Sequence, residues 1–233
     1  MSAKNSVYWV ILLEELWCRK LYVISGLGAD GSIFEYIQFP KKFTEIIYID
    51  WLIPNYNESF ENYVNRMDEK VDVSEKFCLL GYSFGGIMVQ EIHKLKPAEK
   101  VVILGSIKSD KEMSITFHLA KSSRIFAKLP ESYFSEKTIK SYAFFRKLFD
   151  PNNPKLWQYF KVQNPTYLKW SINKILEWKH EEDINVIQIL ADKDIVFPVK
   201  NSKPNYVIKG GTHLFPVTKA KEVSKILEEV FSE

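Results

Sequence analysis

The chain has 233 residues, a formal net charge of +3 at pH 7 and a hydrophobic fraction of 46%. A chain of this length can bury a full core, and these proportions are those of a soluble globular protein rather than a disordered or fibrous one. The slight positive charge comes with no recognition motif, so we expect no binding of nucleic acid.

Residues 1–19 form an N-terminal extension of uncertain status. Their apolar stretch, residues 8–13, is followed at once by Glu14 and Glu15 and lacks a small-residue cleavage site. It is also too short to cross a bilayer, so we expect neither a secretory signal nor a membrane anchor. An added edge strand, an amphipathic helix and translated sequence upstream of the true start all stay open.

The two cysteines, Cys18 and Cys78, give no disulfide framework. Cys78 lies in an apolar run, and we expect it to pack as a small apolar side chain, although a Cys18–Cys78 bond stays open. This cysteine usage favours a reducing compartment, and we predict a cytoplasmic location.

Strand-like apolar runs alternate with helical patterns along most of the chain. This alternation predicts an α/β fold with a mostly parallel sheet that is covered by helices on both faces. The predicted strands span 21–25, 45–50, 77–82, 101–105, 184–190 and 205–208, and the predicted helices of the core span 58–71, 84–95 and 217–231.

The first predicted strand runs into a glycine-rich turn that contains Gly26 and Gly28. A dinucleotide-binding fingerprint would need a third glycine, and Gly31 fits that spacing, with Asp50 about 20 residues further on. However, Asp30 would lie where the pyrophosphate approaches and would repel it. We therefore do not favour a dinucleotide site here.

The most informative stretch joins the predicted strand 77–82 to the predicted helix 84–95. It reads Gly-Tyr-Ser-Phe-Gly over residues 81–85. Gly-x-Ser-x-Gly between a strand and a helix is a nucleophile elbow, a strained turn that lifts the serine oxygen clear of the backbone. A Cβ at position 81 or 85 would clash with the neighbouring backbone. We therefore predict that Ser83 is a nucleophile, and a serine hydroxyl needs a base to take its proton.

Residues 108–179 break the alternation between two consecutive strands, and an excursion of that length needs structure of its own. Helical spacing over 112–128, 136–149 and 166–178 predicts a helical cap rich in aromatic and basic side chains. The simpler interpretation packs the aromatics inside the cap and leaves the lysines in solvent. The alternative is an apolar acyl pocket with a cationic rim that attracts anionic substrates or a membrane surface.

Two acids compete for the role of orienting the base. Both follow the predicted strand 184–190, in the sequence Ala191-Asp192-Lys193-Asp194. We favour Asp194, because it precedes an apolar turn that ends in Pro198 and could bury one carboxylate. Asp192 is the alternative. If it is not the orienting acid, its expected role is to cap the turn.

The chain has only four histidines to supply the base. His93 lies on the helix after the elbow and points away from Ser83, while His118 and His180 lie at the edges of the cap. His213 lies on a glycine-rich turn directly after the predicted strand 205–208, so it can reach back over the sheet. We predict His213 as the base.

From Lys20 onward the chain resembles a small α/β-hydrolase of a bacterial group whose substrates are mostly unassigned. The elbow, the Lys-Asp-x-x-x-Pro loop over 193–198 and the Gly-Gly-x-His loop over 210–213 occur in the expected order. The resemblance implies a core of residues 20–107 and 180–233, with the helical cap 108–179 inserted before the acid strand.

The resemblance also implies an oxyanion hole formed by the backbone N–H groups of Leu27 and Phe84. Many relatives have His-Gly at the first turn, whereas this chain has Ser25-Gly26. No metal or organic cofactor is expected.

The predicted function is a serine hydrolase that cleaves a carboxylic ester or a related acyl bond of a small molecule. The predicted catalytic residues are Ser83, Asp194 and His213. An acyltransferase or lyase that uses the same triad and a ligand-binding relative without turnover are the alternatives. Oligomeric state and substrate identity stay open.

Overall fold

The computed structural model describes residues 18–135 and 158–232. They contain a six-stranded sheet in the order β2-β1-β3-β4-β5-β6, and each neighbouring pair is parallel. The predicted α/β fold is therefore confirmed. The strands are β1 (Lys20–Ile24), β2 (Glu45–Tyr48), β3 (Phe77–Tyr82), β4 (Lys100–Leu104), β5 (Ile187–Ala191) and β6 (Tyr206–Ile208).

Helices cover both faces of this sheet, and alternate residues of each strand divide the core between the faces. Leu79 and Ile103 pack on one side with α2, α3 and α7, while Leu80 and Val102 pack on the other with α8 and α9. The longer helices are α2 (Phe60–Asp68), α3 (Phe84–Leu95), α7 (Pro165–Glu177) and α9 (Ala220–Ser232).

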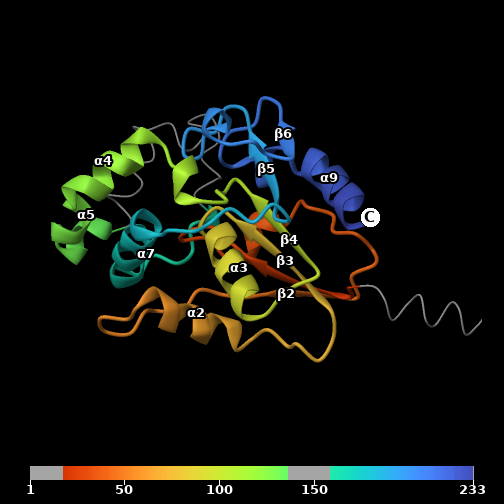
Figure 1. Ribbon diagram of the computed structural model, residues 1–233, viewed down its shortest axis with the longest axis horizontal. Coiled ribbons are helices and arrows are strands. Elements are labelled where there is room, and N and C mark those ends of the chain that lie inside the picture. The colour runs from red at the N-terminus through yellow and green to blue at the C-terminus, as the bar shows by residue number, and fades with distance from the viewer. Residues whose placement is uncertain (1–17, 136–157, 233) are drawn as a thin grey trace, which may run out of the picture.

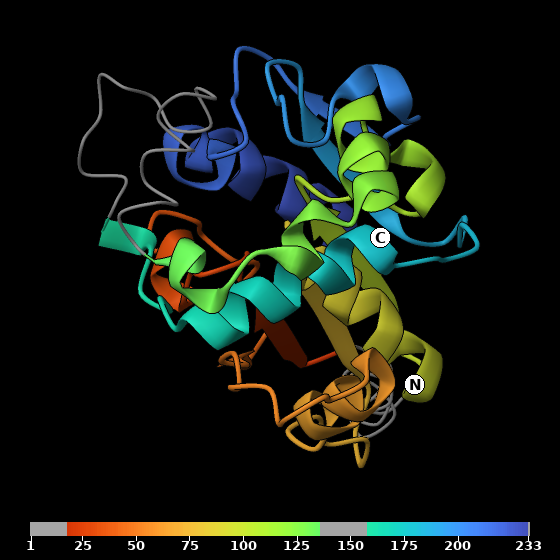
Figure 2. The ribbon, with the colours of Figure 1, turned by 90° about the vertical axis from the view of Figure 1, so that its left-hand side faces the viewer.

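Short helices complete the connections between these elements. α4, α5 and α7 lie on the side of the molecule away from α9 (Figure 1). Figure 2 shows the molecule from that side. The remaining helices are η1 (Gly31–Phe34), η2 (Asp110–Glu112), α4 (Ile115–Ser123), α5 (Ile125–Lys128), η3 (Glu131–Phe134), η5 (Val199–Asn201) and α8 (Phe215–Thr218).

Several predicted boundaries are wrong, and local hydrogen bonds explain why. β5 begins at Ile187 rather than at residue 184, because the Asp183 carboxylate accepts the Asn185 N–H (2.8 Å) and holds a turn there. The predicted helix 112–128 is broken at Arg124, whose φ of 51° ends α4. The predicted helix 217–231 divides at Lys219 into α8 and α9.

Parts of the predicted organisation lie outside the described residues. These are most of the extension 1–19 and the cap segment that contains the predicted helix 136–149. Within residues 18–135 and 158–232, no helix is long and apolar enough to cross a membrane.

The glycine turn after β1 leads into η1, which spans only four residues. The Asp30 carboxylate accepts the Ser32 N–H at 3.0 Å and caps this short helix. A dinucleotide site needs a long helix that opens at this point with its N–H groups free for phosphate. The turn is therefore not a dinucleotide-binding element.

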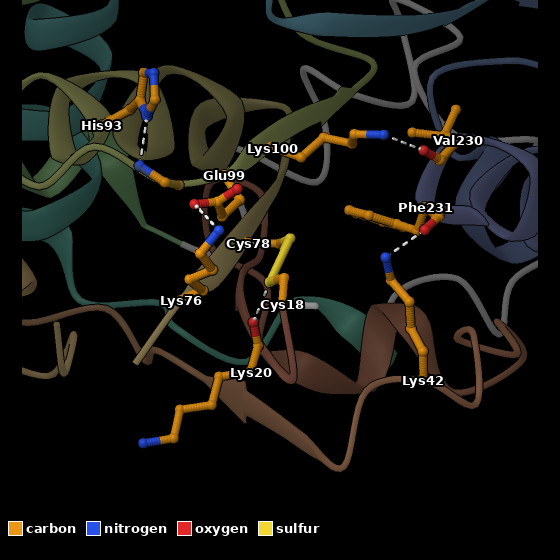
Figure 3. The surroundings of a disulfide bond; sticks show 11 residues. Cys18, Lys20, Lys42, Lys76, Cys78, His93, Glu99, Lys100, Val230 and Phe231 are labelled. Atoms are coloured by element: carbon orange, nitrogen blue, oxygen red, sulfur yellow. Dashed lines mark hydrogen bonds and ion pairs between the residues drawn. A yellow bond between two sulfur atoms is a disulfide. The ribbon is translucent and has the colours of Figure 1, made fainter. Parts of the chain in front are cut away.

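Cys18 and Cys78 are joined by a disulfide, with 6.2 Å between their Cα atoms (Figure 3). Cys78 is buried in β3, as predicted for a small apolar side chain, but it is not a free thiol. β1 pairs with β3, with Leu21 opposite Cys78, and Cys18 lies only two residues before β1. The cysteine argument for a reducing compartment therefore no longer holds, and a cytoplasmic location stays a prediction.

The C-terminal end of α9 is fastened by two lysines from other elements. Lys42 and Lys100 donate from their ammonium groups to the carbonyl oxygens of Phe231 and Val230 (Figure 3). Cationic groups at this position satisfy the last carbonyls of a helix and oppose its dipole. Burial, followed by the nearby charge of Lys100, lowers the pKa of Lys42 below its usual value.

Candidate active site

Ser83 lies at the sharp turn between β3 and α3, with φ 53° and ψ −119°. The turn brings backbone segments so close that only glycine fits on either side. A Cβ at Gly81 would lie 2.2 Å from the Gly85 oxygen, and one at Gly85 would lie 2.3 Å from the Ile24 oxygen. The Ser83 N–H donates to the Leu104 oxygen at 2.9 Å and ties the turn to β4. The predicted elbow geometry is present.

His213 reaches Ser83 from the loop that follows β6. Its Nε2 lies 3.0 Å from the Ser83 Oγ, and its Nδ1 lies 2.7 Å from the Asp194 Oδ2. With the proton on Nδ1, which the carboxylate favours, Nε2 is free to accept the serine proton. The structure thus brings together Ser83, Asp194 and His213, the three residues predicted from the sequence. They lie on three separate loops.

Asp194 and Asp192 differ in burial and in what they contact. The Asp194 carboxylate is fully buried, and its Oδ1 accepts the N–H groups of Val196 (2.8 Å) and Phe197 (3.1 Å). These donors hold the carboxylate in place and stabilise its charge. Asp192 is exposed and accepts the Gly210 N–H at 2.7 Å, so it caps the turn instead.

The other three histidines have different partners or lie in solvent. His93 accepts the Ala98 N–H on its Nδ1, and His180 lies 3.2 Å from the Glu91 carboxylate. His118 is exposed on α4. Within the described ranges, no group of three or more His, Cys, Asp or Glu side chains is placed to hold a metal ion.

Two backbone N–H groups lie beside Ser83, those of Leu27 and Phe84. Within the described part of the chain, neither the Leu27 N–H nor the Phe84 N–H has an acceptor. Phe84 is the first residue of α3, where the helix dipole adds positive potential. A Cβ at Gly26 would lie 3.2 Å from the Ser83 Cβ, so the loop that carries Leu27 runs directly beside the serine. Free donors in this position suit a developing oxyanion.

Tyr82 anchors the backbone of His213, a role the sequence analysis missed. Its hydroxyl donates to the His213 carbonyl at 2.9 Å, and the two rings lie 5.4 Å apart. Burial, followed by the negative charge of Asp194, raises the pKa of Tyr82 well above its usual value. The phenol therefore keeps its proton and its role as a donor. Its place directly before the nucleophile was the signal available in the sequence.

The sequence matches no family model and no curated protein. Its fold, however, is similar to that of many solved structures. A lipase-esterase related protein from Clostridium acetobutylicum is 18% identical, with a TM-score of 0.61 over 91% of this chain and 93% of that one. A hydrolase from Pseudomonas aeruginosa is 13% identical, with a TM-score of 0.65 over 93% and 91%. The RedJ thioesterase of Streptomyces coelicolor is 11% identical, with a TM-score of 0.58 over 90% and 85%.

The chain has the α/β-hydrolase fold. At these identities the likeness extends to the fold alone. In enzymes with this fold the nucleophile, the acid and the histidine occur in that order along the chain. The hydrogen-bonded Ser83, Asp194 and His213 have the same order. In the α/β-hydrolase fold all three residues lie at the carboxyl ends of parallel strands. In this chain β3, β5 and β6 each end in a loop that carries one of them.

An aromatic side chain of the loop after β5 lies beside His213, and a second one from α4 stacks on it. Phe117 of α4 stacks on Phe197, with ring centroids 5.7 Å apart, and Phe197 lies edge-on to His213 at 5.8 Å.

Of the residues near Ser83, Trp51 was also missed by the sequence analysis. Its position just beyond β2, at the same edge of the sheet, was the signal that could have found it.

Proposed function

We propose that the protein is a serine hydrolase that cleaves a carboxylic ester or a related acyl bond. One observation carries this proposal: a continuous hydrogen-bonded chain runs from Ser83 Oγ through His213 to the buried Asp194 carboxylate. The strained elbow supports the same chemistry, as do the two N–H groups beside it, which have no acceptor among the described residues.

The geometry supports a two-step acyl transfer. Ser83 Oγ attacks the acyl carbon while His213 Nε2 takes its proton, and the carbonyl oxygen becomes an oxyanion beside the Leu27 and Phe84 N–H groups. His213 then returns the proton to the departing alcohol, which leaves an acyl-serine. Water attacks that ester with His213 again as base, and the acid is released.

Asp194 acts through the histidine throughout this sequence. Its Oδ2 holds the proton of Nδ1 in place and stabilises the imidazolium that forms when Nε2 is protonated. Because the carboxylate is fully buried and held by two backbone N–H groups, it cannot turn away from the ring.

Aromatic side chains near the site support an apolar acyl or alkyl group as part of the substrate. Phe117 and Phe197 form an apolar wall next to His213. Such a wall suits an apolar acyl or alkyl group more than a charged one. The thioesterase and esterase among the structural neighbours are compatible with acyl substrates of this kind.

The test combines labelling with turnover. Purified protein should react with a fluorophosphonate probe at Ser83 and hydrolyse p-nitrophenyl esters, and Ser83→Ala should do neither. An added alcohol acceptor separates hydrolysis from acyl transfer, since a transferase would yield the new ester in place of the acid. If the wild-type protein neither reacts with the probe nor cleaves any ester, the proposal is wrong, and a ligand-binding role takes its place.

A further inference from the structure

Trp51 contacts Gly26, whose carbonyl shares a peptide unit with the Leu27 N–H, and Phe84, which carries the other N–H group. Trp51 follows β2, and its side chain is buried, with 7% exposed. The indole Nε1–H donates to the Gly26 carbonyl at 3.0 Å. The indole ring also stacks on the Phe84 ring, with centroids 4.8 Å apart and planes 9° from parallel.

The hydrogen bond to Gly26 acts on the Leu27 N–H, because both groups belong to one peptide unit. No peptide bond is cis in the part of the chain that the structure describes. In a planar trans peptide the carbonyl and the following N–H point in opposite directions, so a donor that fixes the first also fixes the second.

The Gly26 oxygen has two donors, since the Ala29 N–H binds it at 3.0 Å as well. Hydrogen bonds along a buried chain polarise one another. The two hydrogen bonds to the Gly26 carbonyl therefore fix the direction of the Leu27 N–H. They also make this N–H a stronger donor.

The stacked ring acts on the second N–H group. Phe84 is fully buried and is the first residue of α3, and the Phe60 ring lies on it at 6.3 Å. The broad face of Trp51 restricts the side chain of Phe84, and with it the position of the backbone that carries the N–H. One side chain thus fixes both donors relative to each other.

We propose that Trp51 is a positioning residue that sets the spacing and direction of the two oxyanion donors. This inference rests on the proposed function, because an oxyanion forms only if Ser83 attacks an acyl group. Trp51 acts through Gly26 and Phe84 and takes no part in proton transfer. A role in core packing alone would require neither the indole N–H nor its direction.

The test removes the N–H and keeps an aromatic ring. Trp51→Phe does so with a smaller ring, and replacement of Trp51 by benzothienylalanine does so with a ring of nearly the same size. In both, the Gly26 oxygen still accepts the Ala29 N–H, so no buried carbonyl is left unpaired. Trp178→Phe is the matched control, because Trp178 is equally buried and donates its Nε1–H to Glu91 (2.7 Å), away from Ser83.

Three quantities are measured for each variant: kcat for a p-nitrophenyl ester per fluorophosphonate-reactive site, KM, and the affinity of an alkylboronic acid that forms a tetrahedral adduct with serine. We expect both Trp51 variants to lose about tenfold in kcat and in boronate affinity with KM little changed. Deleting an oxyanion donor outright costs roughly 10²–10³-fold. Here the donor remains, and its peptide unit loses one of the two hydrogen bonds that hold it. Trp178→Phe should keep all three values.

The outcomes separate the inference from the proposed function. If wild-type protein is active and both Trp51 variants keep kcat per reactive site within twofold, Trp51 is a packing residue and the inference is wrong. The same holds if only the fraction of reactive sites falls. If the wild-type protein neither reacts with fluorophosphonate nor binds the boronate, the proposed function fails and the inference fails with it.

Discussion

The Phe160 ring lies against Gly28, where φ is 75° and a Cβ would be only 2.6 Å from the Phe160 Cε1. The Gly28 carbonyl also accepts the N–H groups of Lys161 (2.8 Å) and Val162 (2.9 Å). The segment that leads into α7 therefore holds the loop of Leu27 on one side, while Trp51 holds it at Gly26. This loop is fixed by parts of the chain that are distant in sequence.

Gly28→Ala should lower kcat for p-nitrophenyl esters at least tenfold, because the added methyl group displaces either Phe160 or the loop. Gly210→Ala is the control, since Gly210 has a similar φ of 69° but only the Lys219 Nζ, at 4.0 Å, near its Cβ position. Both variants should be destabilised by about 1 kcal/mol through the positive φ. An equal fall in kcat for both would show that the Phe160 contact is unimportant.

Ser83→Ala should reduce esterase activity by at least about 10³-fold and abolish fluorophosphonate labelling, since the members of a triad act as a unit. The thermal unfolding midpoint should not fall, because alanine also bears a Cβ and removes only the hydroxyl. Residual activity above a few per cent of wild type would contradict the assignment of the nucleophile.

Asp194→Asn should lower kcat by up to about 10⁴-fold, because an amide favours the wrong imidazole tautomer. Asp192→Asn provides the matched comparison on the same loop. It should cost little activity, since Asp192 contacts the Gly210 N–H and its amide oxygen can keep that bond. If Asp192→Asn proved the more damaging change, the acid role would belong to Asp192.

Phe117→Ala should shift the preferred acyl chain of p-nitrophenyl esters to a greater length, because it removes the ring stacked on Phe197. Each further buried methylene contributes about 0.8 kcal/mol, or about fourfold in kcat/KM, until the space is filled. Phe126→Ala is the control, since Phe126 of α5 packs on Phe134 of η3 instead. Identical chain-length profiles for both variants and wild type would place the acyl group elsewhere.

Glu112→Gln should stabilise the protein at pH 7. Burial raises the pKa of Glu112 above its usual value, although its carboxylate accepts the Lys108 N–H (2.7 Å) and the Gln188 Nε2–H (2.8 Å). An amide oxygen can accept both bonds without a buried charge.

The pH dependence checks the sign of that effect. The protonated carboxyl group contributes stability that is fully present below the pKa of the unfolded chain and is lost as the pH rises through the raised pKa of the folded state. The variant should therefore exceed wild type in urea midpoint at pH 7 and match it below about pH 4, where both states are protonated. Glu177→Gln, at an exposed position of α7, should show no such gain.

The sequence alone determined the features that depend on local chemistry. Apolar runs and their alternation with helical patterns indicated the parallel sheet, because burial on both faces demands them. The glycines at 81 and 85 indicated the elbow, since a backbone approach within 2.2–2.3 Å of a Cβ position admits no other residue. Loops at the ends of strands then indicated Ser83, Asp194 and His213 as neighbours.

Only the tertiary structure decided the features that depend on which distant residues meet. Asp192 and Asp194 both follow the end of β5, and both contact the loop 210–213. Asp194 is buried between the His213 ring and the N–H groups of Val196 and Phe197, whereas Asp192 binds the Gly210 N–H and stays exposed. Cys18, just ahead of β1, meets Cys78 across 60 residues because β1 pairs with β3. Trp51 meets Gly26 and Phe84 because three strand ends converge at one edge of the sheet. Such contacts follow from register and packing, which no local pattern in the chain encodes.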